Sequence, residues 1–180
     1  PNVEINEPIC YNYKAEKDPR VQWPFGYGLS YTTFEYSNLE ATPEVTTKDE
    51  SFTITFDVKN TGKMAADEVA QIYLSPTSDN QNIRPIQLQG FARVSLKPGE
   101  SKKVSVKMYT EQLGYYSRST SGSLQGKNDG QRQWNIKAGQ YIIKIGASSQ
   151  DIKLQQQINV TGEPVTMPLR KYYFSEAKQI

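Results

Sequence analysis

The chain has 180 residues, with 21 Lys or Arg, 19 Asp or Glu, no histidine and a single cysteine. A nearly balanced charge without basic blocks does not favour nucleic acid or an anionic membrane as a partner. No apolar run approaches the roughly 20 residues that span a bilayer. Without histidine, Ser-His-Asp and Cys-His catalysis and histidine-containing zinc sites are excluded, and we expect no cofactor and no metal.

Residues 1–23 are predicted to form an irregular arm, because Pro8, Asn12 and Pro19 interrupt any periodicity. The chain opens at Pro1 without a Met, which indicates a fragment of a longer polypeptide. The arm would then lie against the part of the polypeptide that precedes it.

Residues 24–33 read Pro-Phe-Gly-Tyr-Gly-Leu-Ser-Tyr-Thr-Thr and lead into a strand pattern. Gly26-Tyr27-Gly28 has no preceding strand, no following helix and no third glycine, which argues against a phosphate-binding loop. Gly26 and Gly28 instead permit backbone angles that a Cβ would forbid. We expect them to fold the aromatic side chains inward around a tight corner: Phe25, Tyr27 and Tyr31.

Apolar and polar residues alternate from residue 31 onward, and the clearest strand is 52–59. In the strand at 68–75, Val69 and Tyr73 lie opposite the main apolar face, which indicates that another domain covers them. The run at 86–96 changes phase at Gly90, the usual sign of a β-bulge.

The remaining pattern consists of short strands separated by turns. Pro98-Gly99 predicts a type II turn. Thr110 is predicted to cap a short helical turn, residues 117–132 to form a long loop, and residues 161–180 to form a tail without strands. Further strands are predicted at 104–108, 134–136, 141–145 and 152–160. Seven or more short strands predict an all-β, antiparallel sandwich of the immunoglobulin or fibronectin-III type over residues 24–160.

Five stretches resemble, in order and spacing, landmarks of one known domain. They are 24–33, 67–74 (Asp-Glu-Val-Ala-Gln-Ile-Tyr-Leu), 84–94 (Arg-Pro-Ile-Gln-Leu-Gln-Gly-Phe-Ala-Arg-Val), 96–100 and 146–152. The domain is the C-terminal fibronectin type III-like domain of glycoside hydrolase family 3, the β-glucosidases and β-xylosidases. Two regions depart from the family pattern, because the chain looks enlarged between residues 115 and 132 and is longer after residue 160.

The resemblance implies a function for the parent enzyme and another for this chain. The parent would hydrolyse terminal β-linked glucose or xylose with retention, using carboxylates in domains outside this chain. This chain would be non-catalytic, bracing the catalytic domains of the same polypeptide, and could support a homodimer of the parent. Family members are often exported, so a periplasmic or extracellular location is expected. The alternative is an independent carbohydrate-binding or adhesion module.

A glycosidase needs two suitably spaced carboxyl groups. Asp67-Glu68, Asp49-Glu50 and Asp129 qualify only by residue type, and adjacent acids at strand starts or loop tips are most often solvated. We therefore expect no catalytic residue in this chain.

Two other sets of residues are candidate sites. The predicted domain-docking residues are Trp23, Phe25, Gly26, Tyr27, Gly28 and Tyr73. Following the resemblance, the loop that contains Ser119, Asn128 and Asp129 could approach the substrate mouth of the parent. Exposed tyrosines could instead stack on sugar rings, and the candidates for such a platform are Tyr115 with Tyr116, and residues 172–174.

Overall fold

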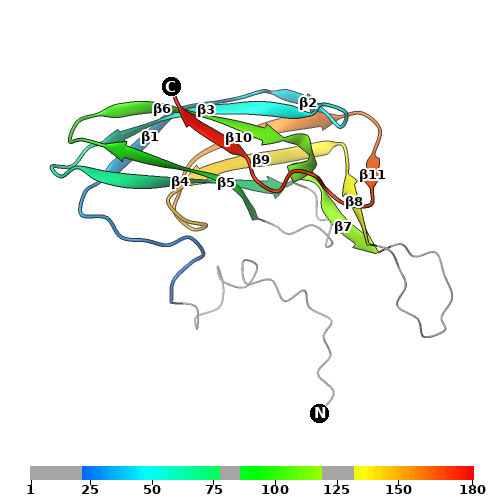
Figure 1. Ribbon diagram of the computed structural model, residues 1–180, viewed down its shortest axis with the longest axis horizontal. Helices are drawn as coiled ribbons and strands as arrows, with labels where there is room; N and C mark the ends of the chain where they lie inside the picture. Colours follow the sequence, from blue (N-terminus) through cyan, green and yellow to red (C-terminus); the bar gives the residue numbers. More distant parts are fainter. Residues whose placement is uncertain (1–21, 78–85, 119–131) are drawn as a thin grey trace, which may run out of the picture.

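The computed structural model describes residues 22–77, 86–118 and 132–180. Two packed β-sheets form the body, and a smaller third sheet extends from one end (Figure 1). The first sheet has the order β1 (Phe34–Ala41), β3 (Ser51–Asn60), β6 (Ser101–Tyr109) and β12 (Glu176–Gln179). The second has the order β2 (Glu44–Thr46), β10 (Ile152–Thr161), β9 (Gly139–Gly146), β4 (Ala66–Pro76) and β5 (Gln87–Leu96). The third contains β11 (Val165–Met167), β8 (Arg132–Ile136) and β7 (Tyr115–Arg118).

The predicted antiparallel β-sandwich is confirmed. Its strands pair antiparallel, except that β10 pairs parallel with the short strand β2. Among the described residues, no helix is long and apolar enough to cross a membrane.

The core lies between the two large sheets. On β3, Ile54, Phe56 and Val58 are fully buried, while the residues between them face outward. They pack in one cluster with the inward residues of the opposite sheet, which include Ile72 and Ile143. Each such side chain contributes about 1.5–3 kcal/mol by leaving water, so the period-two pattern is sufficient to specify the two layers.

The bulge predicted at Gly90 is confirmed. Ile72 lies opposite Gly90 and Tyr73 lies opposite Leu88, so that Gln89 is the extra residue on β5. A Cβ on Gly90 would lie 1.9 Å from the Ser175 hydroxyl. The glycine is therefore needed for the close approach of the C-terminal segment.

The prediction that residues 161–180 form a tail without strands is wrong. β11 pairs with β8, and β12 pairs with β6, with Gln179 opposite Val104. All four residues of β12 are exposed, so the strand has no alternating pattern that could reveal it. Its pairing comes from the otherwise free edge of β6.

The short helical turn is the 3₁₀-helix η1 (Thr110–Leu113), but Thr110 does not cap it. The Tyr109 N–H donates to Gln112 Oε1 at 2.9 Å instead. The Thr110 hydroxyl is buried with no hydrogen-bond partner in the described part of the chain.

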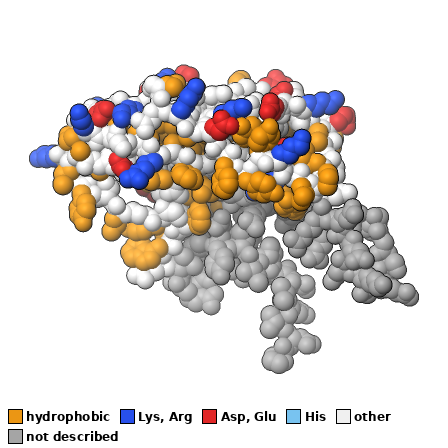
Figure 2. Space-filling view, viewed as in Figure 1, with side chains coloured by type: hydrophobic (Ala, Val, Ile, Leu, Met, Phe, Trp, Pro, Cys, Tyr) orange, Lys and Arg blue, Asp and Glu red, His pale blue; other side chains and the backbone are white. Residues whose placement is uncertain are grey.

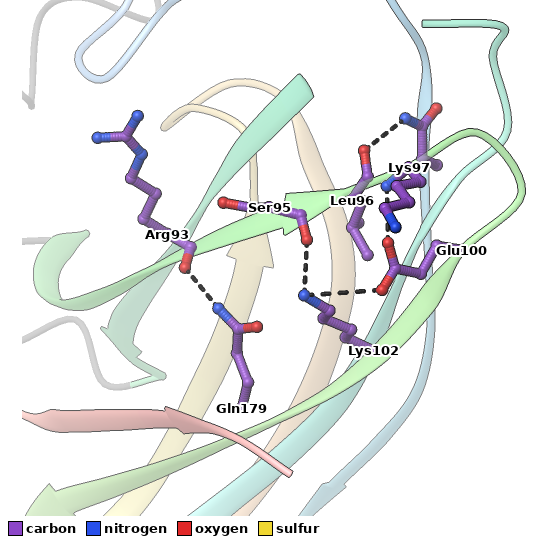
Figure 3. A network of polar contacts seen from close by, with 8 residues as sticks. Arg93, Ser95, Leu96, Lys97, Glu100, Lys102 and Gln179 are labelled. Atoms are coloured by element: carbon purple, nitrogen blue, oxygen red, sulfur yellow. Dashed lines mark hydrogen bonds and ion pairs between the residues drawn. The ribbon is translucent and has the colours of Figure 1, made fainter. Parts of the chain in front are cut away.

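Polar side chains cover the free edge of β5 (Figure 3). Lys102 Nζ donates to the Ser95 carbonyl at 2.8 Å, and Gln179 Nε2 donates to the Arg93 carbonyl at 3.1 Å. The adjacent turn has Gly99 at φ 78°, and its closing hydrogen bond runs from the Glu100 N–H to the Lys97 carbonyl at 3.0 Å. The predicted type II turn is thus confirmed. Lys102 and Gln179, which bond to carbonyls of β5, protect the edge of that strand from pairing with another chain.

Candidate docking surface

The segment 24–33, here called the junction segment, is fastened to the outer face of β4. Gln71 Nε2 donates to the Gly26 carbonyl at 2.8 Å and to the Ala147 carbonyl at 2.6 Å. The Phe25 carbonyl accepts from the Ser149 N–H at 2.9 Å. The junction segment is therefore tied both to a central strand and to the turn between β9 and β10.

Tyr73 lies beneath this attachment. Its hydroxyl donates to Gln71 Oε1 at 2.5 Å, and its side chain is fully buried. Burial raises the pKa of Tyr73 to about 12, so the hydroxyl stays protonated and can donate. The sequence predicted Tyr73 as a docking residue, but it holds Gln71 in place from below and offers no exposed surface of its own.

The two glycines of the junction segment differ. Gly26 has φ 78°, and a Cβ there would lie 1.9 Å from Gln71 Oε1. Gly28 has no positive φ, and apart from its chain neighbours no atom of the described residues lies within 4 Å of where its Cβ would be. The backbone requirement expected of both glycines is confirmed for Gly26 and is wrong for Gly28.

The aromatic side chains of this region point outward. Trp23, Phe25 and Tyr27 are 57%, 44% and 43% exposed, and the rings of Trp23 and Tyr27 stack with centroids 4.6 Å apart. Tyr31 is 93% exposed. The prediction that these rings fold inward is wrong, because it is the carbonyls of Phe25 and Gly26 that bond to the sandwich, while the rings stay exposed.

Exposed apolar residues on the adjacent strands extend this region. Phe91 lies directly across from Gln71 on the same face, and Val69 lies two residues before Gln71 on that face. Their side chains are 56% and 42% exposed. We call the resulting set the docking surface: Trp23, Phe25, Tyr27, Val69 and Phe91. Figure 2 shows hydrophobic side chains gathered along the side of the molecule from which the junction segment descends (Figure 1).

Two of the acidic candidates, Asp67 and Glu68, lie on opposite faces of one sheet. They are neighbours on β4, and successive side chains of a strand point to opposite faces. Hydrogen bonds from Ser95 and then Arg93 hold the pKa of Asp67 below its usual range. Burial raises the pKa of Glu68, whose carboxylate accepts from the Tyr36 hydroxyl at 2.5 Å.

The other acidic candidates have local roles or lie outside the described residues. Asp49 accepts from the Thr46 N–H at 2.7 Å, and Glu50 accepts from the Tyr172 hydroxyl at 3.1 Å. In the described ranges, no three acidic or cysteine side chains are placed to hold a metal ion. The predicted mouth-loop residues Ser119, Asn128 and Asp129 lie outside the described residues.

The residues considered as a sugar platform are covered only in part. Tyr115 is 7% exposed. Tyr172 stacks on Tyr109, with ring centroids 3.8 Å apart and planes 3° from parallel. The Arg170 guanidinium lies over the Tyr173 ring, 4.4 Å from its centroid. Tyr115 and Tyr172 are therefore covered, whereas Tyr116, Tyr173 and Phe174 remain exposed.

Sequence reasoning did not identify Gln71 or Asn60. The Asn60 amide is fully buried and donates to the carbonyls of Met64 and Leu96 at 2.7 and 3.1 Å. Its Oδ1 accepts from the Thr32 hydroxyl at 2.8 Å. The only signal for Gln71 is a long polar side chain between Val69 and Tyr73, on a face that is otherwise partly apolar.

The sequence of the chain is similar to that of a known domain family and of several longer proteins. A fibronectin type III-like domain model matches residues 68–149. The chain is 32% identical over 165 residues to thermostable β-glucosidase B of Acetivibrio thermocellus, covering 92% of this chain and 20% of that protein. It is 39% identical over 132 residues to a putative β-xylosidase of Formosa agariphila, covering 73% of this chain and 16% of that protein.

A solved structure agrees with these relatives. The structure of β-glucosidase 3B from Thermotoga neapolitana in complex with glucose superposes with a TM-score of 0.70 and 31% identity, covering 87% of this chain and 19% of that one. The chain thus spans about a fifth of the length of such proteins. It therefore carries a fibronectin type III-like domain and belongs with the corresponding part of the glycoside hydrolase family 3 enzymes.

Proposed function

We propose that this chain is the non-catalytic, C-terminal accessory domain of a family 3 glycoside hydrolase and that it docks against the catalytic body of the same polypeptide. The parent would release terminal β-linked glucose or xylose with retention of configuration. Support comes from relatives named as β-glucosidase and β-xylosidase, which are about five times longer than this chain. The two carboxylates that the reaction requires would lie in that additional length.

The docking surface is the observation that carries the proposal. Large contiguous apolar patches are uncommon on the free surface of a soluble protein and mark interaction sites. Here the side chains are aromatic or β-branched, and Trp23, Phe25 and Tyr27 flank the point where the chain joins the sandwich. Aromatic rings with a polar tip are suited to such interfaces.

The attachment through Gln71 explains how docking would brace the parent. Because the amide fixes the junction segment on β4, its exposed rings are positioned before any contact forms. A pre-organised surface loses less conformational entropy on binding than a flexible linker does. A surface of about 1,000 Å² would be ordinary for two domains of one chain.

The proposal is tested by separating catalysis from docking. The 180-residue chain, purified away from hydrolases, should not cleave chromogenic β-glucosides or β-xylosides, and turnover by this chain would contradict the proposal. In the longer polypeptide, Trp23→Ser with Tyr27→Ser should lower the thermal unfolding midpoint and the activity retained after heating. Met64→Ser, at a residue of matched exposure on the β3–β4 turn, should change neither.

Three further elements of the proposal rest on the resemblance alone. A periplasmic or extracellular location is tested by cell fractionation, and a dimer of the parent by sedimentation. Deleting residues 119–130 in the parent should alter its preference among oligosaccharides, and unchanged kinetic constants would contradict a role for that loop at the substrate mouth.

A further inference from the structure

Four side chains from three segments form a continuous stack, here called the aromatic ladder: Tyr116, Trp134, Arg170 and Tyr173. The Tyr116 ring meets Trp134 edge-on with centroids 4.6 Å apart. The Arg170 guanidinium lies 4.8 Å from the Trp134 ring centroid and 4.4 Å from that of Tyr173. The ladder therefore joins β7 and β8 to the segment that follows β11.

The ladder is held rigidly by the body of the sandwich. Trp134 Nε1 donates to the Glu111 carbonyl at 2.8 Å, and a Cβ on Gly114 would lie 2.4 Å from that same nitrogen. The Glu111 carboxylate accepts from the Lys171 N–H at 2.6 Å, next to Arg170. The side chains of the aromatic ladder are thus held in place before any other surface binds, which lowers the entropic cost of binding.

Both ends of the ladder are open to solvent. Tyr116 and Tyr173 are 40% and 47% exposed, and the neighbouring Leu169 and Phe174 are 65% and 79% exposed. Tyrosine, tryptophan and arginine are enriched in the energetic centres of protein interfaces. Arg170 Nε is buried and has no hydrogen-bond acceptor among the described residues. The surface thus presents exposed apolar side chains around a guanidinium that lies between two aromatic rings.

We infer that the aromatic ladder, with Leu169 and Phe174, is a second docking point for the body of the same longer polypeptide. This rests on the proposed function. The matching surface would be apolar, because Leu169, Tyr173 and Phe174 are the exposed side chains that it would meet. Figure 1 shows strands β7 and β8 and the junction segment leaving the sandwich on the same side, and Figure 2 shows hydrophobic side chains along that side.

A second docking point would add to what the docking surface provides. Two contacts at separate places restrict the orientation of the domain more than one contact does. Because the two parts are tethered, the local concentration is high, and even a weak second contact would be occupied.

Hydroxyl-radical footprinting tests this on the unmodified protein, comparing the 180-residue chain with the longer polypeptide. Labelling of Tyr173 and Phe174 should fall about fivefold in the longer polypeptide, because interface centres exclude water. Met64 serves as the internal control and should be labelled equally in both.

The outcomes separate the two proposals. Protection of Trp23 and Tyr27 without protection of Phe174 would overturn the second docking point and leave the proposed function in place. Unchanged labelling at all of these residues would overturn both.

A variant supplies independent support. Phe174→Ser should raise proteolytic cleavage of the longer polypeptide about tenfold, which corresponds to about 1.4 kcal/mol of docking. It should leave the 180-residue chain unchanged, and Met64→Ser should have no effect in either form. An equal effect of Phe174→Ser in both forms would show that the residue only stabilises the domain itself, contrary to the inference.

Discussion

The side-chain amide of Gln71 donates to the backbone carbonyl of Gly26 at 2.8 Å across 45 positions of sequence. The same nitrogen reaches the Ala147 carbonyl, and the amide oxygen accepts from the Tyr73 hydroxyl. One buried side chain thus joins the junction segment, a central strand and the β9–β10 turn. The exposed rings on either side of Gly26 depend on it for their position.

Replacing this amide should destabilise the domain. Gln71→Ala leaves two carbonyls without their donor, and we expect a loss of about 2 kcal/mol in the free energy of unfolding. Gln155→Ala, at an exposed glutamine on β10, is the matched control and should change it by less than about 0.5 kcal/mol. Urea unfolding of both variants measures the difference, and equal midpoints would contradict the assignment.

The two glycines of the junction segment should respond differently to the same substitution. Gly26→Ala places a Cβ in a left-handed conformation, which costs about 1–2 kcal/mol, and also against the Gln71 amide. Gly28→Ala meets no described atom within 4 Å and should be nearly neutral. Thermal unfolding of the two variants provides the comparison. A larger loss for Gly28→Ala would mean that the turn is not positioned as described.

The Tyr36–Glu68 contact should make stability depend on pH. Burial raises the folded-state pKa of Glu68, against a smaller opposing effect of the hydrogen bond from Tyr36. The fold therefore favours the protonated carboxyl. Its contribution to stability is complete below the unfolded pKa of about 4.3 and is lost as the pH rises through the higher folded pKa.

Glu68→Gln removes this titration. The substitution can also change the free energy of unfolding by an amount that does not depend on pH. Beyond that amount, the variant should become more stable relative to the natural chain as the pH rises from about 4 to about 7. Tyr36→Phe should act in the opposite sense, since it removes the donor to a buried carboxylate at a cost of about 2 kcal/mol at pH 7. Chemical unfolding at a series of pH values tests both, and parallel pH profiles for Glu68→Gln and the natural chain would contradict the raised pKa.

The passage of the C-terminal segment over Gly90 can be tested by paired substitutions. Gly90→Ala would force its Cβ against the Ser175 hydroxyl, and overpacking of this kind costs about 1–3 kcal/mol. Ser175→Gly removes the obstructing atoms, so most of that cost should disappear in the double variant. A double-mutant cycle on unfolding free energies measures the coupling. Additive effects would show that the two residues do not meet.

Local patterns predicted the strands of the sandwich but not every element. Alternation identified β3 because Ile54, Phe56 and Val58 all face one core. It could not identify β12, whose residues are all exposed and whose partner β6 lies about 70 residues earlier in the chain. The sequence named Trp23, Phe25 and Tyr27 of the docking surface but not Phe91, and the inward orientation that it predicted for the junction aromatics is wrong.

The amino-acid sequence by itself determined the layered all-β architecture, the bulge at Gly90 and the likeness to one domain of a hydrolase family, because these depend on neighbouring residues and short motifs. The tertiary structure alone decided which side of β4 is covered, which way the junction aromatics point and how the C-terminal segment closes onto the sheet. Those outcomes depend on pairs such as Gln71 with Gly26 and Gly90 with Ser175. Such contacts join segments distant in sequence, and the free energy that selects them appears only when the chain is folded.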